Sequence, residues 1–196
     1  MTLITMPSSP AFTRSEWGIK RTVAKSESPY TGATQVYKYP NSQWYANLTL
    51  PPMKRSQAVA WQAFFLSAEG IANTFLVGDP DAKAVNGSAT SATVAATAAI
   101  GATEVNLNIG AGNTLNRGSY LQLGVDASAR LYMIVDDNTS DGIVSIQPSL
   151  KTAITGSTTA AIVNAKGVFR MANNDQSWSA NEISIYGLTF SVVEAL

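Results

Sequence analysis

The stretch from residue 44 to residue 80 constrains the fold more than any other part of the chain, because four consecutive elements can be predicted in it. Apolar and polar side chains alternate from Trp44 to Leu50, which is the two-residue period of a strand with one buried face. Pro51 and Pro52 follow, and since proline lacks an N–H donor, the hydrogen-bonded ladder must stop there. The face expected to be buried consists of Trp44, Ala46, Leu48 and Leu50.

A helix of about three turns is predicted over residues 56–69, which hold no Gly or Pro and are rich in Ala, Gln, Leu and Phe. Ser56 is the expected N-cap and Gly70 the expected stop. We expect core packing for Trp61 and Phe65. A short strand, 74–77, and the turn Gly78-Asp79-Pro80 follow. The stripe expected to face a sheet comprises Val59, Ala63 and Leu66, widened by Ala60 and Phe64.

The rest of the chain predicts β structure. Alternation over residues 35–39, with a link at Pro40-Asn41-Ser42, predicts a β-hairpin that leads into the strand at Trp44. Between residues 81 and 93 the composition shifts to Ala, Ser, Asn, Gly and Thr, which predicts a linker or long loop. Further strands are expected at 105–109, 120–123, 130–135, 143–147, 160–163, 167–172 and 182–193.

The spacing of these strands, roughly 10 to 15 residues, favours a small barrel or sandwich with antiparallel connections. The last segment places Ser184, Tyr186, Leu188, Phe190 and Val192 on one face, so we expect it to complete the N-terminal sheet. The predicted fold class is mainly β with one helix. A β-sandwich-like domain is expected from residues 1–80 and 166–196, with a small β-barrel or sandwich module inserted at 81–165, or else an elaborate hairpin extension of a single domain.

The sequence lacks the residues on which most catalytic sites depend. It has no histidine and no cysteine, which excludes Ser-His-Asp triads, histidine metal sites, thiolate chemistry and disulfides. A glycosidase needs only two carboxylates, which Asp79 with Asp81, or Glu182 with Glu194, could supply. Ordinary turn capping is the favoured interpretation of Asp79 and Asp81. We therefore expect no catalytic residue.

Two loops invite a ligand interpretation and fail it. Residues 136–142 resemble the start of a calcium loop, but the position of the bidentate Glu is Pro148, so a solvated hairpin turn is favoured. Gly110-Ala111-Gly112 lacks the third glycine of a dinucleotide fingerprint, because residue 115 is Leu. We expect no metal and no cofactor.

Charge limits the partners. The 13 basic and 13 acidic residues cancel, and basic residues cluster no further than the pairs Lys20-Arg21 and Lys54-Arg55, so direct nucleic-acid binding is not expected. Charged residues make up only 13% of the chain, which suits protein contact better than free solution. We expect no secretory signal in residues 1–10, and the longest run of low polarity, 93–102, is too short to span a bilayer.

The order of these elements resembles the distal tail proteins of long-tailed bacteriophages. The resemblance is carried by Gln43 to Arg55 (QWYANLTLPPMKR), by the helix containing AxxWxAFFL and by Asn73 to Pro80 (NTFLVGDP), and continues in 118–124, 146–151 and 168–171. It implies a structural virion protein with a ring-forming β domain, often with a further β module. The implied assembly is a ring of identical subunits, six in this family, at the distal end of the tail tube.

The implied partners are further copies of the chain, the tail tube protein, the tail-tip hub protein and the tape-measure protein. The implied location is the tail tip of the virion, after synthesis in the host bacterial cytoplasm. Tail-tube and tail-terminator proteins share the same β-rich, charge-poor character. We expect ring contacts at a corner, at a turn and in an N-terminal arm around Trp17 to Tyr30. The corner consists of Pro51, Pro52, Met53, Lys54 and Arg55. The turn consists of Asp79 and Pro80.

A second interpretation is a binding module, in which the inserted domain recognises a host-surface glycan through stacked aromatic rings. The only aromatic residues between 81 and 165 are Tyr120 and Tyr132, and both lie within predicted strands. An enzyme ranks third, because histidine is missing.

Overall fold

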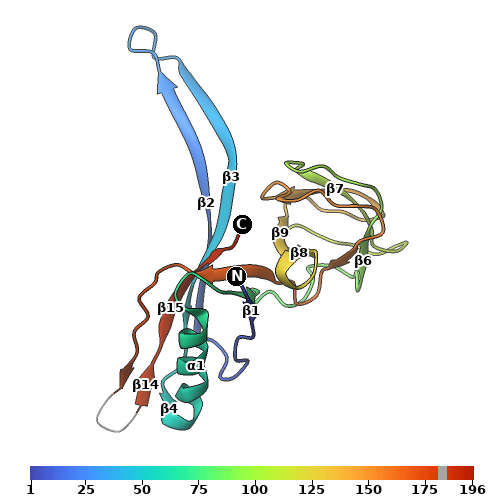
Figure 1. Cartoon of the computed structure of the whole chain (residues 1–196). Coiled ribbons are helices and arrows are strands. Elements are labelled where there is room, and N and C mark those ends of the chain that lie inside the picture. The colour runs from blue at the N-terminus through green and yellow to red at the C-terminus, as the bar shows by residue number, and fades with distance from the viewer. Residues whose placement is uncertain (181–184) are drawn as a thin grey trace.

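The structure is a computed structural model that describes residues 1–180 and 185–196. It is mainly β with one α-helix, as the sequence predicts. Figure 1 shows a body made of strands and the helix, a barrel beside it, and a long hairpin that rises from the body. The strands are β1 (Leu3–Ile4), β2 (Arg14–Glu27), β3 (Thr34–Thr49), β4 (Met53–Lys54), β5 (Thr74–Val77), β6 (Ala92–Val94), β7 (Glu104–Asn108), β8 (Tyr120–Leu123), β9 (Arg130–Ile134), β10 (Gly142–Gln147), β11 (Thr159–Ala161), β12 (Gly167–Met171), β13 (Ser179–Ala180), β14 (Ile185–Gly187) and β15 (Thr189–Glu194).

The body contains a six-stranded sheet in the order β1-β5-β12-β15-β3-β2. The last strand, β15, lies between β12 and β3 and pairs antiparallel with both, which confirms that the C-terminal segment completes the N-terminal sheet. The chain leaves the sheet after β5 and returns in β12, and these two strands are antiparallel neighbours. Both connections to the barrel therefore begin at one place in the sheet.

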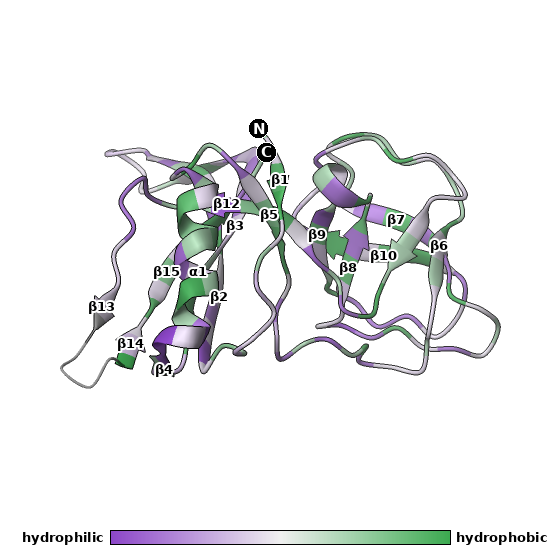
Figure 2. Ribbon diagram, turned by 60° about the horizontal axis from the view of Figure 1, so that its bottom comes forward, coloured by the Kyte–Doolittle hydropathy of each residue, from purple (hydrophilic) through white to green (hydrophobic). Residues whose placement is uncertain are grey.

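The helix α1 spans Arg55–Ala68 and covers this sheet (Figure 2). Its predicted stripe is wrong for Val59, which is 48% exposed, and for Leu66, which is 69% exposed, but Phe64 is buried as predicted, as are Trp61 and Phe65. The aromatic residues take the buried face instead, because three large rings bury more apolar area than Val, Ala and Leu. The predicted N-cap is also wrong, since Lys54 holds that position without a side-chain cap. The buried helical residues are Ala58, Trp61, Phe64, Phe65 and Ala68.

The barrel closes through six strands in the order β10-β7-β6-β11-β8-β9. Five of its strands lie where alternation predicted them. The sixth, β6, lies at the end of the segment predicted as a long loop, because its pattern of Ala, Thr and Val is too short and too weakly apolar to be recognised. A 3-10 turn, η1 (Asp126–Ser128), joins β8 to β9.

The chain buries two main hydrophobic cores. One lies between the sheet and α1 and contains the predicted strand face from Trp44 to Leu50, all of it buried. The other fills the barrel and draws on residues between Ala89 and Ile162. Tyr120 and Leu131 come from barrel strands but belong to the core of the body. The two cores therefore meet along β8 and β9.

The hairpin differs most from its prediction. The turn expected at Pro40-Asn41-Ser42 is wrong, since β3 runs unbroken through these residues and pairs with β2 on both sides of them. The pairing shifts between Arg21↔Ser42 and Val23↔Lys38, so three residues of β3 face only Thr22 of β2. Proline fits this bulge, because the extra residues there need not donate to the ladder.

The predicted strand at residues 182–193 is divided in the structure. β14 ends at Gly187 and β15 begins at Thr189, with Leu188 buried between them. β14 pairs with β4 and β13 in a small second sheet at the lower end of α1 (Figure 1). The predictions for Glu182 and Ser184 lie outside the described residues.

Candidate functional site: an exposed hairpin arm

The part of the hairpin that extends beyond the body, residues 20–41, is the most distinctive surface of the chain, and we call it the arm. Every residue in it is exposed except Ser28, which is half-buried. Strand β15 pairs with β3 only from Tyr45 to Thr49, and β2 pairs with no described strand other than β3. Both edges of the arm therefore present backbone N–H and C=O groups that no described strand pairs.

The tip of the arm is a tight turn that holds a tyrosine outward. The Ser28 N–H donates to the Ala33 carbonyl at 2.9 Å, and the Gly32 N–H donates to the Ser28 carbonyl at 3.0 Å. Gly32 has φ +67°, a conformation that costs glycine little. Tyr30 is 96% exposed at this point.

Apolar side chains lie on both faces of the arm. Val23 and Val36 belong to one face and Tyr37 to the other, as the register Val23↔Lys38 and Ala24↔Tyr37 requires. Each of them, and Tyr39, exposes about half of its surface or more. A two-stranded ribbon of this kind is at best marginally stable alone in water, so it gains most from a partner that covers it.

The arm carries a charge that the rest of the chain balances. It holds four basic residues and Glu27 as its one acid, a net charge of +3, whereas the whole chain is neutral and the remainder therefore carries −3. One ion pair forms within it, between Lys25 and Glu27 at 2.9 Å. The other three cations, Lys20, Arg21 and Lys38, form no ion pair with any described residue.

The root of the arm is held by buried polar contacts. The Gln43 amide donates to the Glu194 carbonyl at 2.6 Å, and the Trp44 N–H donates to a carboxylate oxygen of Glu194 at 3.1 Å. The Trp44 indole N–H donates to the Leu131 carbonyl in β9 at 2.9 Å. Lys151 Nζ donates to the Ser42 carbonyl. These contacts fix the direction in which the arm leaves the body.

Glu194 is the most deeply buried charged side chain among the described residues, with 1% of its surface exposed. Burial raises the pKa of its carboxyl, and the Trp44 N–H and the charges of Lys151 and Arg130 oppose that rise. Burial likewise lowers the pKa of Lys151. These three charged residues lie where the root of the arm, the sheet and the barrel meet.

Trp17 packs within its own chain. Its ring lies 5.6 Å from that of Phe169, 6.5 Å from that of Trp44 and 6.4 Å from that of Tyr120, measured between centroids. The Tyr120 hydroxyl lies 3.4 Å from a carboxylate oxygen of Asp79, and burial first, then this neighbour, raises the pKa of Tyr120. Trp17 and Asp79 thus take part in the junction between sheet and barrel.

The other predicted contact residues are dispersed. Met53 is buried in the core beneath α1, whereas Pro52, Lys54 and Arg55 are exposed near the lower end of the helix. Pro51 and Pro80 are half-buried. The structure brings only Tyr30 of the predicted set into the arm. The predicted arm around residues 17–30 covers Arg21 and Val23 without naming them, whereas Val36, Tyr37, Lys38 and Tyr39 lie outside it. Val36 and Tyr37, apolar side chains on opposite faces of β3, were the available signal for this second strand.

The carboxylates considered as catalytic or metal-binding groups have other partners. Asp79 accepts from the Asp81 N–H at 3.1 Å, which is the predicted turn contact. Asp137 pairs with Arg117 at 2.6 Å, and this bond lowers the pKa of Asp137 to about 2. Asp141 accepts from the backbone N–H of Ile109 at 2.7 Å. Across residues 1–180 and 185–196, no three acidic side chains gather as a metal site requires.

The chain matches no model of a known protein family and no curated protein sequence. Among the described residues, no helix combines the length and the apolar character needed to cross a membrane.

Proposed function

We propose that this chain is a structural subunit that assembles with copies of itself into a ring at the distal end of a bacteriophage tail tube. The ring would connect the tube to the tail-tip or baseplate hub. The observation that carries the proposal is the arm: a long ribbon whose edges no described strand pairs and whose residues are exposed, apart from the half-buried Ser28.

The arm offers enough apolar surface to support association. Burying a Val or an aromatic side chain is worth about 1.5–3 kcal/mol, whereas association costs on the order of 4–15 kcal/mol in lost freedom. The exposed apolar side chains of one arm can offset the lower part of that cost. In a ring each subunit contributes one arm and receives another, so every subunit has two such contacts.

The form of the contact favours a closed ring over a symmetric pair. The projecting arm of one subunit and the surface of the neighbour that receives it are different patches, so the contact is heterologous. Repeated heterologous contacts form a closed ring when the rotation between neighbouring subunits closes. Charge supports the same arrangement, because an arm of +3 meets a remainder of −3 on a neighbouring copy. The number six comes from the resemblance to distal tail proteins.

The location in a phage tail is proposed because the segment from residue 43 to residue 80 resembles distal tail proteins in sequence. The strand, corner, helix and second strand of this segment all belong to the body. The tail tube protein, the hub protein and the tape-measure protein are the partners this proposal implies. It assigns no active site and no cofactor.

The alternative, a glycan-binding barrel, has less support. The two tyrosines between residues 81 and 165 are buried, Tyr120 against the body and Tyr132 inside the barrel. Neither ring is available as a stacking platform for a sugar.

The test is the native mass of the purified protein by light scattering over a range of concentrations. We expect a species near six times 20.7 kDa for the natural chain. Replacing residues 22–41 with a two-residue Asn-Gly turn, which joins the opposed residues Arg21 and Ser42, should leave a monomer at the same concentrations.

Two matched substitutions sharpen the result. Tyr37→Ser in the arm should weaken assembly, whereas Ile143→Ser, at an exposed position on the barrel, should not. If the chain with the shortened arm forms the same ring as the natural chain, the arm is not the ring contact and the proposal fails. A natural chain that stays monomeric at every concentration also contradicts self-assembly through the arm.

A further inference from the structure

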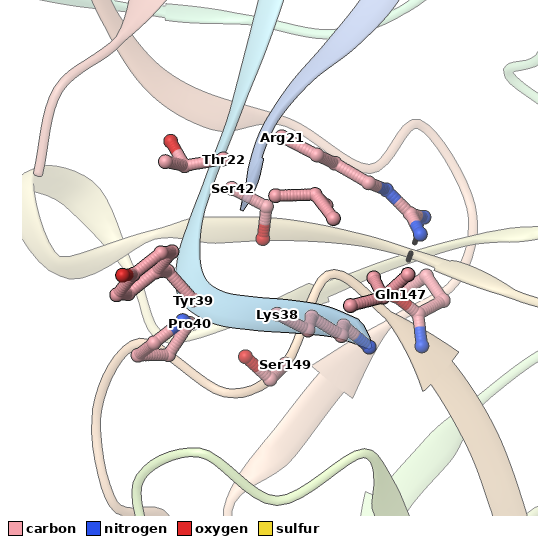
Figure 3. A pocket seen from close by; sticks show the side chains of 10 residues that line it. Arg21, Thr22, Lys38, Tyr39, Pro40, Ser42, Gln147 and Ser149 are labelled. Carbon is pink, nitrogen blue, oxygen red and sulfur yellow. Dashed lines mark hydrogen bonds between the residues drawn. The ribbon is translucent and has the colours of Figure 1, made fainter. Parts of the chain in front are cut away.

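A hollow of about 210 Å³ lies at the root of the arm, between the bulge of the hairpin and the barrel. Arg21, Lys38, Tyr39 and Pro40 come from the arm, and Gln147 comes from the end of β10 (Figure 3). The hollow is formed by one chain, because residues at the bulge of the hairpin line one side of it and Gln147 and Ser149 line the other.

The hollow is electropositive. The Arg21 guanidinium and the Lys38 ammonium both extend toward Gln147, and no acidic residue lines the hollow (Figure 3). Arg21 makes one long hydrogen bond, 3.4 Å to the Gln147 side-chain oxygen, which leaves most of its donors free. Lys38 has no polar partner among the described residues. Two cations without a counter-ion in a concave surface favour an anionic group.

The rest of the lining is suited to a sugar. Tyr39 and Pro40 form a largely apolar wall on one side, and hydroxyl groups lie around the other surfaces (Figure 3). An aromatic ring packs on the C–H face of a sugar, and hydroxyl side chains exchange hydrogen bonds with its OH groups. The hydroxyls of Thr22, Ser42 and Ser149 form no hydrogen bond with any other described side chain or backbone group.

We propose that this hollow binds one unit of an acidic saccharide, with the carboxylate or phosphate of the sugar between Arg21 and Lys38 and its ring against Tyr39. A simple ion would use the cations and leave the apolar wall uncovered. The volume is smaller than the ~300–1,000 Å³ of a drug-sized site, which limits the ligand to about one sugar ring.

The hollow is held in shape before any ligand arrives. Lys151 Nζ donates to the Ser42 carbonyl, and Arg21 reaches Gln147, so the barrel restrains both strands of the hairpin on the root side of the bulge. Pro40 has a fixed φ and contributes little flexibility. A restrained site loses less conformational entropy on binding.

The test is an NMR titration of the full chain, following backbone amide signals, with four small probes: glucuronate, glucose 6-phosphate, glucose and N-acetylaspartate. We expect both acidic sugars to shift the signals of residues 38–42 and 147–149, with dissociation constants on the order of millimolar because the cations are exposed. The two acidic sugars distinguish a carboxylate from a phosphate ligand. Neutral glucose should bind at least about tenfold more weakly, since it lacks the charged contact.

Three variants test the side chains that are proposed to contact the sugar. Arg21→Gln and Lys38→Gln should each weaken glucuronate binding by about tenfold, and Tyr39→Ala by about fivefold. Lys25→Gln is the matched control, because it removes a charge from the arm outside the hollow. All four positions are exposed, and a thermal unfolding curve of each variant verifies that its fold is retained.

The absence of shifts with both acidic sugars at about 50 mM overturns the proposal. Equal binding of N-acetylaspartate and glucuronate also overturns it, and assigns the hollow to a carboxylate of a protein partner. The titration is repeated with the Tyr37→Ser chain, whose assembly is weakened and whose hollow is intact because Tyr37 does not line it, so its failure is distinguishable from failure of the proposed assembly.

Discussion

Replacing residues 22–41 with an Asn-Gly turn should leave the stability of a single chain almost unchanged while it abolishes assembly. None of the removed residues belongs to a hydrophobic core of the structure. The polar contacts of the root, from Arg21 to Gln147 and from Lys151 to the Ser42 carbonyl, are retained because both ends of the shortened hairpin stay in place.

Two small effects of opposite sign determine how much the shortened arm changes the free energy of unfolding. Loss of the arm's own cross-strand pairs, all exposed, costs about 1 kcal/mol or less in net terms, because an isolated ribbon is marginally stable. Shortening the connection from about 22 to about 4 residues lowers the loop-closure cost by at most about 1.5 kcal/mol. We expect the free energy of unfolding to change by less than about 1 kcal/mol in either direction.

Urea unfolding followed by tryptophan fluorescence measures this change, because all four tryptophans lie outside the removed segment. Both chains must be measured at concentrations where the natural chain is dissociated, since assembly would add stability. A loss of more than about 3 kcal/mol would show that the arm is part of the folding unit, and it would refute the argument that the arm is free for a partner.

Three further predictions concern the body and its junction with the barrel. Trp61→Ala, on the buried face of α1, should lower the free energy of unfolding by about 3–5 kcal/mol. Leu66→Ala, on the exposed face, should lower it by less than about 0.5 kcal/mol. Urea unfolding measures both changes, and equal losses would contradict the assignment of the buried face. Burial raises the pKa of Glu194 in the folded state, so the folded state binds a proton at this carboxyl more tightly than the unfolded state does. The natural chain should therefore lose stability, relative to Glu194→Gln, as the pH rises from about 4.5 toward 7. Melting temperatures at several pH values would test this, and a difference independent of pH would contradict it. Gly78→Ala places a Cβ 2.2 Å from the Ala165 carbonyl oxygen, where the barrel connections meet, and should cost about 1–3 kcal/mol; an unchanged urea midpoint would contradict the close approach.

Much of the local structure could be predicted from the chain. The alternation from Trp44 to Leu50 is buried on the predicted face, and the strand at 74–77 has the predicted bounds. The barrel strands after residue 104 were recognisable because each alternates and is bounded by Gly, Asp or Asn. Such signals are local, since a strand with one buried face records its environment in its own two-residue period.

The arm could not be predicted in the same way. Pro40 usually marks the end of a strand, and only the pairing of β2 with β3 shows that it occupies a bulge. Residues 14–27 were not predicted as a strand, because only Trp17, Ile19 and Val23 among them are large and apolar and polar, charged or small residues fill the rest. Trp17 was expected at an interface for this reason, although three aromatic neighbours from distant parts of the chain surround it.

The sequence by itself determined the kind of protein: mainly β, with one helix, with a low density of charge, and without histidine or cysteine for catalysis. Those properties follow from composition and from contacts between residues near in sequence. Tertiary structure alone decided which helix face is buried, how β15 joins β3 and β12, and that the arm leaves the body with its surfaces free. The physical reason is that burial is a property of the whole assembly of elements, since each side chain is covered or exposed by segments far away in the sequence.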